Sequence, residues 1–136
     1  MKQLAAMKSL TTLDLGLTKV SDAGLKQLSG LKSLTVLRLE KVGLTDDGLK
    51  EIGKLDSLTT LDLTNTAVTD AGLKELSSLK DLKKLQLGNT KVTDVGMKEL
   101  VPLKNLTFLE VSGTGVTAKG VAEVKKGLPK CKIVSQ

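Results

Sequence analysis

Five leucines recur at intervals of 24 residues, and this spacing limits the possible folds more than any other feature of the chain. They are Leu10, Leu34, Leu58, Leu82 and Leu106. From each of them the sequence reads L-x-x-L-x-[LV]-x-x-[TV]-x-[VL]-[ST]-[DA]-x-G-[LMV]-x-x-[LIV]. Residues 10–33 and 58–81 are identical at 17 of 24 positions. A repeat of this period predicts one supersecondary unit that is stacked several times.

The hydrophobic period changes within each repeat. Leu61 and Leu63 alternate with polar neighbours, as in a short strand with one buried face. Leu73, Leu76 and Leu79 recur every third residue, as in a helical return segment. A single unit leaves both apolar stripes uncovered, so neighbouring units must bury them. The pattern predicts a right-handed α/β solenoid, with a parallel sheet of about six strands on its concave side and short helices on its convex side.

All the repeats are expected to belong to one domain, residues 1–136. We expect a partial repeat (1–9), five repeats (10–33, 34–57, 58–81, 82–105 and 106–127) and a terminal strand segment (128–136). In the last repeat the helix is expected to end at Gly127, just before Pro129. The segment Cys131-Lys132-Ile133 is aligned with Leu109-Glu110-Val111 as a sixth strand, which places Cys131 at a buried leucine position.

The repeats resemble leucine-rich repeats, whose signature is L-x-x-L-x-L-x-x-[NC]-x-L. The continuation V-T-D-x-G-L is similar to the cysteine-containing subclass, with threonine in place of cysteine, as in bacterial leucine-rich repeat proteins. The resemblance extends from Leu4 to about Val134. It implies the solenoid fold and a scaffold for binding other proteins. The subclass also implies an adaptor in a ubiquitin-ligase-like complex, although the chain has no F-box-like segment.

Composition argues against several classes of function. The chain lacks histidine, which removes the commonest general base and metal ligand, and its single cysteine excludes an intrachain disulfide. The net charge is +6, but only one of the 21 cations is arginine and only one residue is aromatic. Because nucleic-acid surfaces favour arginine and stacking aromatics, the lysines are interpreted as a solvated surface. No apolar run is long enough to cross a membrane, and the compartment is left open.

The polar residues that recur in every repeat are interpreted as structural. The turn after the strand has a threonine whose hydroxyl is expected to join neighbouring repeats in a ladder; these are Thr18, Thr66, Thr90 and Thr114. A Ser-Asp or Thr-Asp pair before each helical stripe is typical of a helix cap. The pairs are Ser21-Asp22, Thr45-Asp46, Thr69-Asp70 and Thr93-Asp94, with Ala118 in place of the last aspartate. The glycine two residues after each aspartate is expected to let the helix pack closely on the strand layer.

No metal or cofactor site is predicted. The aspartates of the caps fall one repeat apart, which is too far for several of them to bind one ion. No base is available to activate the threonine hydroxyls as nucleophiles, so catalysis is not expected. Cys131 is expected to be a buried structural thiol.

The residues that vary between repeats lie at the outward positions of the strands. The central column is read as Asp14, Arg38, Asp62, Gln86, Glu110 and Lys132. The column before it is read as Thr12, Val36, Thr60, Lys84, Phe108 and Lys130, and the one after it as Gly16, Glu40, Thr64, Gly88, Ser112 and Val134. Across strands about 4.8 Å apart, Asp14, Arg38 and Asp62 are expected to form an ion-pair ladder. Phe108 either contributes to binding or covers its neighbours on the adjacent strands.

The leading hypothesis is a non-enzymatic module that binds a protein partner through the concave sheet face. The candidate binding residues are Arg38, Asp62, Lys84, Gln86, Phe108 and Glu110. The alternative is a structural or engineered consensus-like array, or a spacer segment of a larger bacterial surface or effector protein. Since the chain starts in the middle of a repeat, self-association through exposed terminal strands is also expected. Neither nucleic acid nor membrane is expected as a partner.

Overall fold

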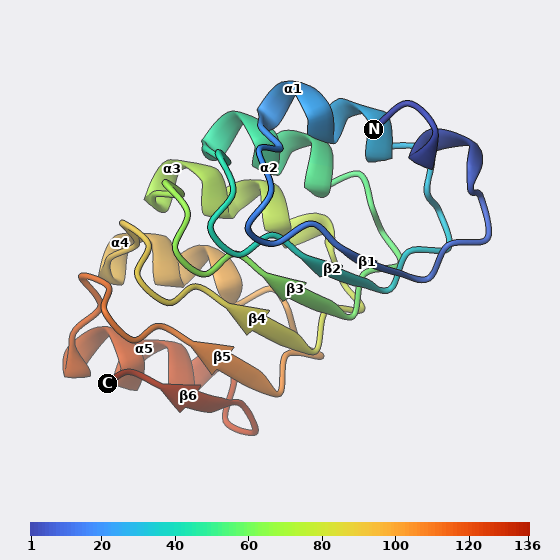
Figure 1. The fold of residues 1–136 in the computed structure, drawn as a ribbon. Coiled ribbons are helices and arrows are strands. Elements are labelled where there is room, and N and C mark those ends of the chain that lie inside the picture. Colours follow the sequence, from blue (N-terminus) through green and yellow to red (C-terminus); the bar gives the residue numbers. More distant parts are fainter.

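A computed structural model describes all 136 residues as one stack of repeats (Figure 1). Six strands form one parallel sheet in the order of the sequence: β1 (Thr12–Asp14), β2 (Val36–Arg38), β3 (Thr60–Asp62), β4 (Lys84–Gln86), β5 (Phe108–Glu110) and β6 (Lys132–Val134). The strands alternate with the helices α1 (Asp22–Leu25), α2 (Asp46–Ile52), α3 (Asp70–Leu73), α4 (Asp94–Met97) and α5 (Ala118–Gly127). Short 3₁₀ helices complete the return segments: η1 (Leu4–Ala6), η2 (Lys26–Leu28), η3 (Lys74–Ser78) and η4 (Lys98–Leu100).

The two layers share one apolar core. Figure 1 shows the helices stacked along one face of the sheet, with the two termini at opposite ends of the stack. The middle residue of each strand, a leucine in β1–β5 and Ile133 in β6, points into this core, and these residues pair in register from strand to strand. Three of these residues, Leu37, Leu61 and Leu85, are fully buried. The predicted α/β leucine-rich solenoid with six parallel strands is therefore confirmed. None of the helices is long and apolar enough to span a bilayer.

The sixth strand has a different register from the one predicted. Lys132 pairs with Phe108 and Ile133 with Leu109, so Cys131 precedes the strand. The N–H of Cys131 donates to the carbonyl of Leu128, as the N–H of Leu106 donates to Leu103 in the repeat before. Cys131 therefore does take a buried leucine position, that of Leu106, and it is 1% exposed. The predicted register was wrong because the last repeat has one more residue before Cys131 and one fewer between Cys131 and the strand than the repeat before it.

The threonines of the turns do not form the predicted ladder. The hydroxyls of Thr18, Thr66 and Thr90 each donate to the carbonyl three residues earlier in the same repeat, at 2.6–2.7 Å. Thr66 and Thr90 are 6% and 5% exposed, so this bond satisfies a buried hydroxyl. The same turns contain a column of residues with positive φ: Leu17 (62°), Lys41 (54°), Asn65 (59°), Asn89 (55°) and Gly113 (68°).

The repeats are instead joined by the aspartates that begin the helices. Oδ1 of Asp46 accepts the N–H of Thr69 at 2.8 Å, and its Oδ2 accepts the Thr69 hydroxyl at 2.6 Å. The same pair of bonds joins Asp22 to Thr45, Asp70 to Thr93 and Asp94 to Thr117. Each Thr hydroxyl also caps its own helix, accepting a backbone N–H at 3.3–3.4 Å. The predicted threonine caps are thus confirmed, but Ser21 makes no such bond.

The recurring glycines make room for these carboxylates. A Cβ added at Gly72 would overlap Oδ1 of Asp46 and would lie 2.8 Å from Cδ1 of Leu49. Both groups belong to the preceding helix, α2. Added at Gly96 or Gly120, a Cβ would overlap Asp70 or Asp94 in the same way. The close approach is therefore between neighbouring helices, whereas the sequence had suggested contact between helix and strand.

Candidate binding face

One face of the sheet is free of helices, and we call the outward side chains of β1–β6 the open face. All six predicted binding residues lie on it, on four adjacent strands: Arg38, Asp62, Lys84, Gln86, Phe108 and Glu110. They lie there because side chains alternate along a strand, and the leucine between each pair of outward positions is buried. The open face thus carries mostly polar side chains, with Val36, Val134 and the ring of Phe108 among them, above a layer of leucines.

The predicted ion-pair ladder on the first three strands is absent. No carboxylate oxygen lies within 4.0 Å of the Arg38 guanidinium, since the ion pairs of the structure join Lys50 to Asp47, Lys54 to Glu51 and Lys126 to Glu123. Oδ1 of Asp14 instead accepts the N–H of Gly16 at 2.9 Å, and Oδ1 of Asp62 accepts that of Thr64 at 3.0 Å. Each carboxylate is held by its own strand, and Arg38 keeps its donors free.

Arg38 lines a shallow hollow at this end of the open face. The hollow is lined by Asp14, Gly16, Leu17, Arg38, Glu40 and Asp62. Three of these residues are acidic and one is basic, so the hollow carries a net negative charge. Glu40 was placed on this face by the sequence but was not among the predicted binding residues.

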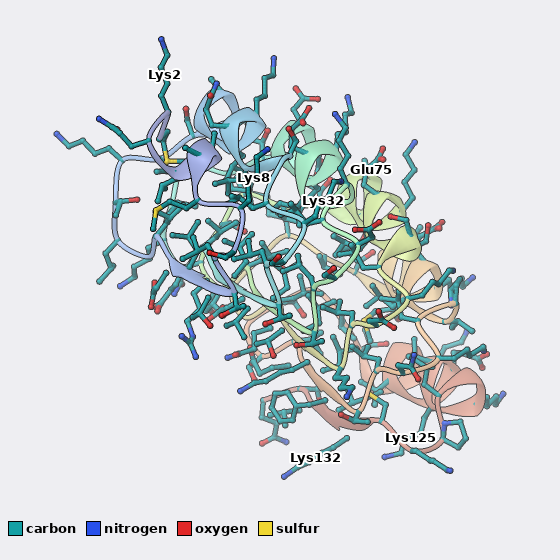
Figure 2. All side chains as sticks on the ribbon, turned by 90° about the vertical axis from the view of Figure 1, so that its right-hand side faces the viewer. Lys2, Lys8, Lys32, Glu75, Lys125 and Lys132 are labelled. Atoms are coloured by element: carbon teal, nitrogen blue, oxygen red, sulfur yellow. The ribbon has the colours of Figure 1, made fainter.

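A second cluster surrounds Phe108 on the last three strands. The Phe108 ring is half-buried, and Nζ of Lys84 on β4 lies 5.2 Å from its centroid. On the other side Phe108 pairs with Lys132 of β6. Figure 2 shows the Lys132 side chain extending away from the stack. A cation within about 6 Å of an aromatic face is attracted to the ring. We call Lys84, Phe108 and Lys132 the aromatic–lysine cluster.

Lys132 was missed as a neighbour of Phe108 although the sequence contained the signal. The two residues are 24 positions apart, which is the spacing of the repeat. The alignment through Cys131 shifted Lys132 into the central column, where Val134 stands instead beside Glu110. Glu110 itself bonds to its own strand, since its Oε1 accepts the N–H of Ser112 at 2.8 Å.

The two clusters are separate. Arg38 lies on β2 and Phe108 on β5, and three strand spacings of about 4.8 Å put roughly 14 Å between them. The open face therefore carries a mainly acidic hollow at one end and a basic, partly aromatic surface at the other. A partner that contacts both must be an extended segment or a surface of similar length.

The recurring polar groups at the helix starts have partners, and the single cysteine is buried. The aspartates of the caps each accept two hydrogen bonds from a threonine. The hydrogen bonds from the Thr117 hydroxyl and N–H lower the pKa of the Asp94 carboxyl. No group of three His, Cys, Asp or Glu side chains converges as it would on a metal ion. Burial raises the pKa of the Cys131 thiol, which disfavours the reactive thiolate.

The lysines of the helical side are exposed, as expected for a solvated surface. Lys26, Lys74 and Lys98 form a column along the helices without an ion-pair partner within 4.0 Å. Figure 2 shows Lys2 at one end of the stack and Lys125 and Lys132 at the other. Because these lysines lie at opposite ends of the stack, the positive charge is spread along the molecule and does not form one patch.

Comparison with known families agrees with the geometry. Two models, both described as leucine-rich repeat, match residues 56–116 and residues 6–29. The chain is a leucine-rich repeat protein. No curated protein sequence matches it. Proteins of this family are in general interaction modules, not enzymes.

Among solved structures, bacterial leucine-rich repeat proteins are similar to this chain. An internalin (inlF) from Listeria monocytogenes is 26% identical with a TM-score of 0.83, over 98% of this chain and 37% of that one. An internalin C2 (inlC2) from the same organism is 26% identical with a TM-score of 0.81, over 100% of this chain and 56% of that one. A leucine-rich repeat protein of Leptospira interrogans is 28% identical with a TM-score of 0.68, over 96% and 38% respectively. The chain thus spans between about a third and just over half of these proteins.

Proposed function

We propose that this leucine-rich repeat protein is a non-enzymatic module that binds a protein partner through the open face of its sheet. One observation carries the proposal. The inward position of β2, β3, β4 and β5 is always a leucine, whereas the outward positions beside it differ in charge and size from strand to strand. A face that only covered the core would not need such variety, and a recognition surface does.

The physical basis of binding is a preformed surface. The carboxylates of Asp62 and Glu110 are already held by backbone N–H groups of their own strands, so little side-chain freedom is lost on association. Arg38 has no ion-pair partner and is available for a carboxylate of the partner. Phe108 offers apolar area beside Lys84, a combination that suits an acidic or aromatic side chain.

The test is a comparison of two double variants on a partner captured by crosslinking and then purified. Arg38→Ala with Phe108→Ala removes the centre of each cluster of the open face. Lys74→Ala with Lys98→Ala removes two exposed helix-side cations and serves as the matched control. We expect the open-face variant to bind at least about tenfold more weakly and the control to bind as the original chain does. Equal Kd values for all three proteins would contradict the proposal.

The second candidate function is a structural array in which the open face has no partner. The identity of 17 of 24 positions between residues 10–33 and 58–81 favours it, because a spacer needs only a uniform stack. The same pair of variants distinguishes the two functions. A spacer would lose its role when the stack is destabilised and would be unaffected by changes at Arg38 and Phe108.

A further inference from the structure

The cations are spread evenly along the stack, but the carboxylates are not. Residues 1–81 contain 11 cations and 11 carboxylates, whereas residues 82–136 contain 10 lysines and 4 carboxylates. The whole net charge of +6 therefore belongs to the part of the stack from β4 to β6. Of these 10 lysines, only Lys126 has an ion-pair partner within 4.0 Å. Charge complementarity on this part of the molecule therefore favours a negatively charged partner.

The aromatic–lysine cluster brings two of these lysines to the open face. Lys84 and Lys132 pair with Phe108 from the strands on either side of β5, so the three side chains form one row across β4, β5 and β6. Both lysines are exposed, and neither has an ion-pair partner within 4.0 Å. The ring between them is only half-buried. The row therefore offers one apolar contact that is flanked by two free ammonium groups.

The carboxylate of Glu110 limits where an acidic partner can lie. Glu110 is the next outward position along β5 after Phe108, and its Oε1 is fixed by the N–H of Ser112. A negatively charged group placed above it would be repelled. On the other side of the row, the exposed residues Lys83 and Lys130 precede β4 and β6. An acidic segment is therefore best placed over the row itself and toward the starts of the strands.

The spacing of the row favours a helix over an extended segment. Two strand spacings of about 4.8 Å put the Cα atoms of Lys84 and Lys132 roughly 10 Å apart. On one face of an extended segment, successive side chains lie about 7 Å apart, so no pair falls at this separation. On a helix, positions i and i+7 lie about 10.5 Å apart, and position i+4 lies between them on the same face. Carboxylates at i and i+7 can therefore meet the two lysines while an apolar side chain at i+4 meets the ring.

We propose that the aromatic–lysine cluster binds an acidic helix of the partner protein. The helix carries carboxylates at positions i and i+7 and an apolar side chain at i+4, and it lies across β4, β5 and β6. Its carboxylates accept hydrogen bonds from Nζ of Lys84 and Lys132, and its apolar side chain packs on the Phe108 ring. The inference rests on the proposed function, because it names the class of partner that the open face binds.

A nucleic acid fits the row less well than an acidic helix. Surfaces that stack bases use several aromatic rings, and phosphate contacts favour arginine. The row has one ring, and the single arginine, Arg38, lies on β2. The carboxylate of Glu110 also adjoins the row and would repel a continuous chain of phosphates.

The experiment is an NMR titration of the full, isotope-labelled chain with three helical peptides. Each peptide has about 18 residues, mostly alanine and glutamine, so that it is long enough to form a helix. The first has glutamate at i and i+7 and leucine at i+4. The second has glutamine in place of both glutamates, and the third has lysine in their place. We expect only the acidic peptide to shift the amide signals of β4, β5 and β6 to saturation.

Two double variants of the chain test the contacts. Lys84→Gln with Lys132→Gln removes both cations of the row. Lys98→Gln with Lys119→Gln removes two exposed lysines from the helical side of the same part of the stack, and it is the matched control. We expect the Kd of the acidic peptide to rise at least about fivefold in the first variant and less than about twofold in the control. Replacing the leucine of the peptide by alanine should also raise the Kd, because the contact with Phe108 is lost.

Two results would overturn the inference and leave the proposed function standing. One is a glutamine or lysine peptide that shifts the signals of β4–β6 as strongly as the acidic peptide does. The open face would then bind peptides, but the class of partner would be wrong. The other is an absence of shifts on the open face with all three peptides. The proposed function would in that case still be decided by the Kd values of the Arg38 and Phe108 variant.

Two further results would also overturn it. Equal rises of the Kd in both double variants would show a general attraction to positive charge and no site at the row. A single-stranded oligonucleotide of about 12 nucleotides that binds the row more tightly than the acidic peptide would make nucleic acid the occupant. Saturable binding of the acidic peptide alone, lost only when Lys84 and Lys132 are replaced, would support the acidic helix.

Discussion

The carboxylate of Asp70 accepts two hydrogen bonds from Thr93 of the next repeat, from its N–H at 2.7 Å and from its hydroxyl at 2.6 Å. The same hydroxyl accepts the N–H of Val95 at 3.3 Å and so caps its own helix. One threonine therefore links the start of one helix to the start of the next. Because the pair recurs along the stack, it fixes the spacing of the helices as the strand ladder fixes that of the sheet.

The first prediction concerns this pair. Asp70→Ala leaves the N–H and hydroxyl of Thr93 without their acceptor, and Thr93→Val removes the hydroxyl with little change of shape. Hydrogen bonds to a charged group contribute about 1.5–3 kcal/mol, so we expect each variant to lose stability in that range. In a double-mutant cycle by urea unfolding, we expect a coupling of about 1 kcal/mol or more. Additive losses would show that the two residues act independently.

The second prediction compares two glycines of the same motif. Gly72→Ala introduces a methyl group into the space of the Asp46 carboxylate, and overpacking of this kind costs about 1–3 kcal/mol. Gly24→Ala meets no carboxylate, so the ordinary gain of about 0.5–1 kcal/mol for alanine in a helix is expected there. The measurement is the free energy of unfolding of both variants. Equal losses at the two sites would mean that the glycines serve some other purpose.

The fold was predictable because the leucine positions repeat without interruption and change period at the same point of every unit. The link between repeats was not, since a Thr-Asp pair before a helix is fully accounted for as a cap within its own repeat. Nothing in one repeat reveals that Asp46 reaches Thr69, 23 residues further on. The glycine was misassigned for the same reason, because its neighbour is the aspartate of the preceding repeat.

The outward positions of the open face were predictable from alternation, but their contacts were not. Asp62 was expected to pair with Arg38 on the adjacent strand, yet it accepts the N–H of Thr64, two residues along its own strand. A hydrogen bond from Asp62 to a backbone N–H orders only the aspartate side chain. An ion pair with Arg38 would also order a long, flexible arginine and would therefore lose more side-chain entropy. The register of β6 was lost for a different reason: Cys131 is followed directly by the strand, whereas Thr107 separates the equivalent Leu106 from Phe108.

The third prediction concerns the turn residues with positive φ. Leu17 adopts a φ of 62° and is 74% exposed, whereas Asn65 adopts 59° at the equivalent turn. This conformation costs most residues about 1–2 kcal/mol and costs asparagine less. We expect Leu17→Asn to raise the free energy of unfolding by about 1 kcal/mol and Asn65→Leu to lower it. A thermal unfolding scan that found Leu17→Asn destabilising would contradict the strain inferred at this turn.

The fourth prediction is a pH dependence of stability. The Thr117 hydroxyl and N–H hold the pKa of Asp94 below its ordinary value of 3.8. Because the folded pKa is the lower one, Asp94 stabilises the fold above its unfolded pKa, and this contribution is lost as the pH falls through the folded pKa. We therefore expect the free energy of unfolding to fall less steeply between about pH 5 and pH 2 in Asp94→Asn than in the original chain. The measurement is urea unfolding at a series of pH values.

The control for this prediction is Asp81→Asn, since Asp81 is exposed and accepts no hydrogen bond. It should leave the shape of the pH profile close to that of the original chain. If Asp94→Asn and Asp81→Asn gave the same profile, the hydrogen bonds from Thr117 would not be the source of the acid sensitivity.

The central claim is that stability and recognition are carried by different residues: the Thr-Asp-Gly motif joins the repeats, and the open face is free for a partner. The most direct measurement compares the free energy of unfolding of two proteins. The first is the single variant Asp70→Ala. The second replaces five open-face residues at once by side chains of similar shape: Arg38→Gln, Asp62→Asn, Lys84→Gln, Phe108→Leu and Glu110→Gln. We predict that the five changes together cost less than about 1.5 kcal/mol and less than Asp70→Ala alone. A larger loss for the open-face variant would show that this face holds the stack together, and would contradict the account.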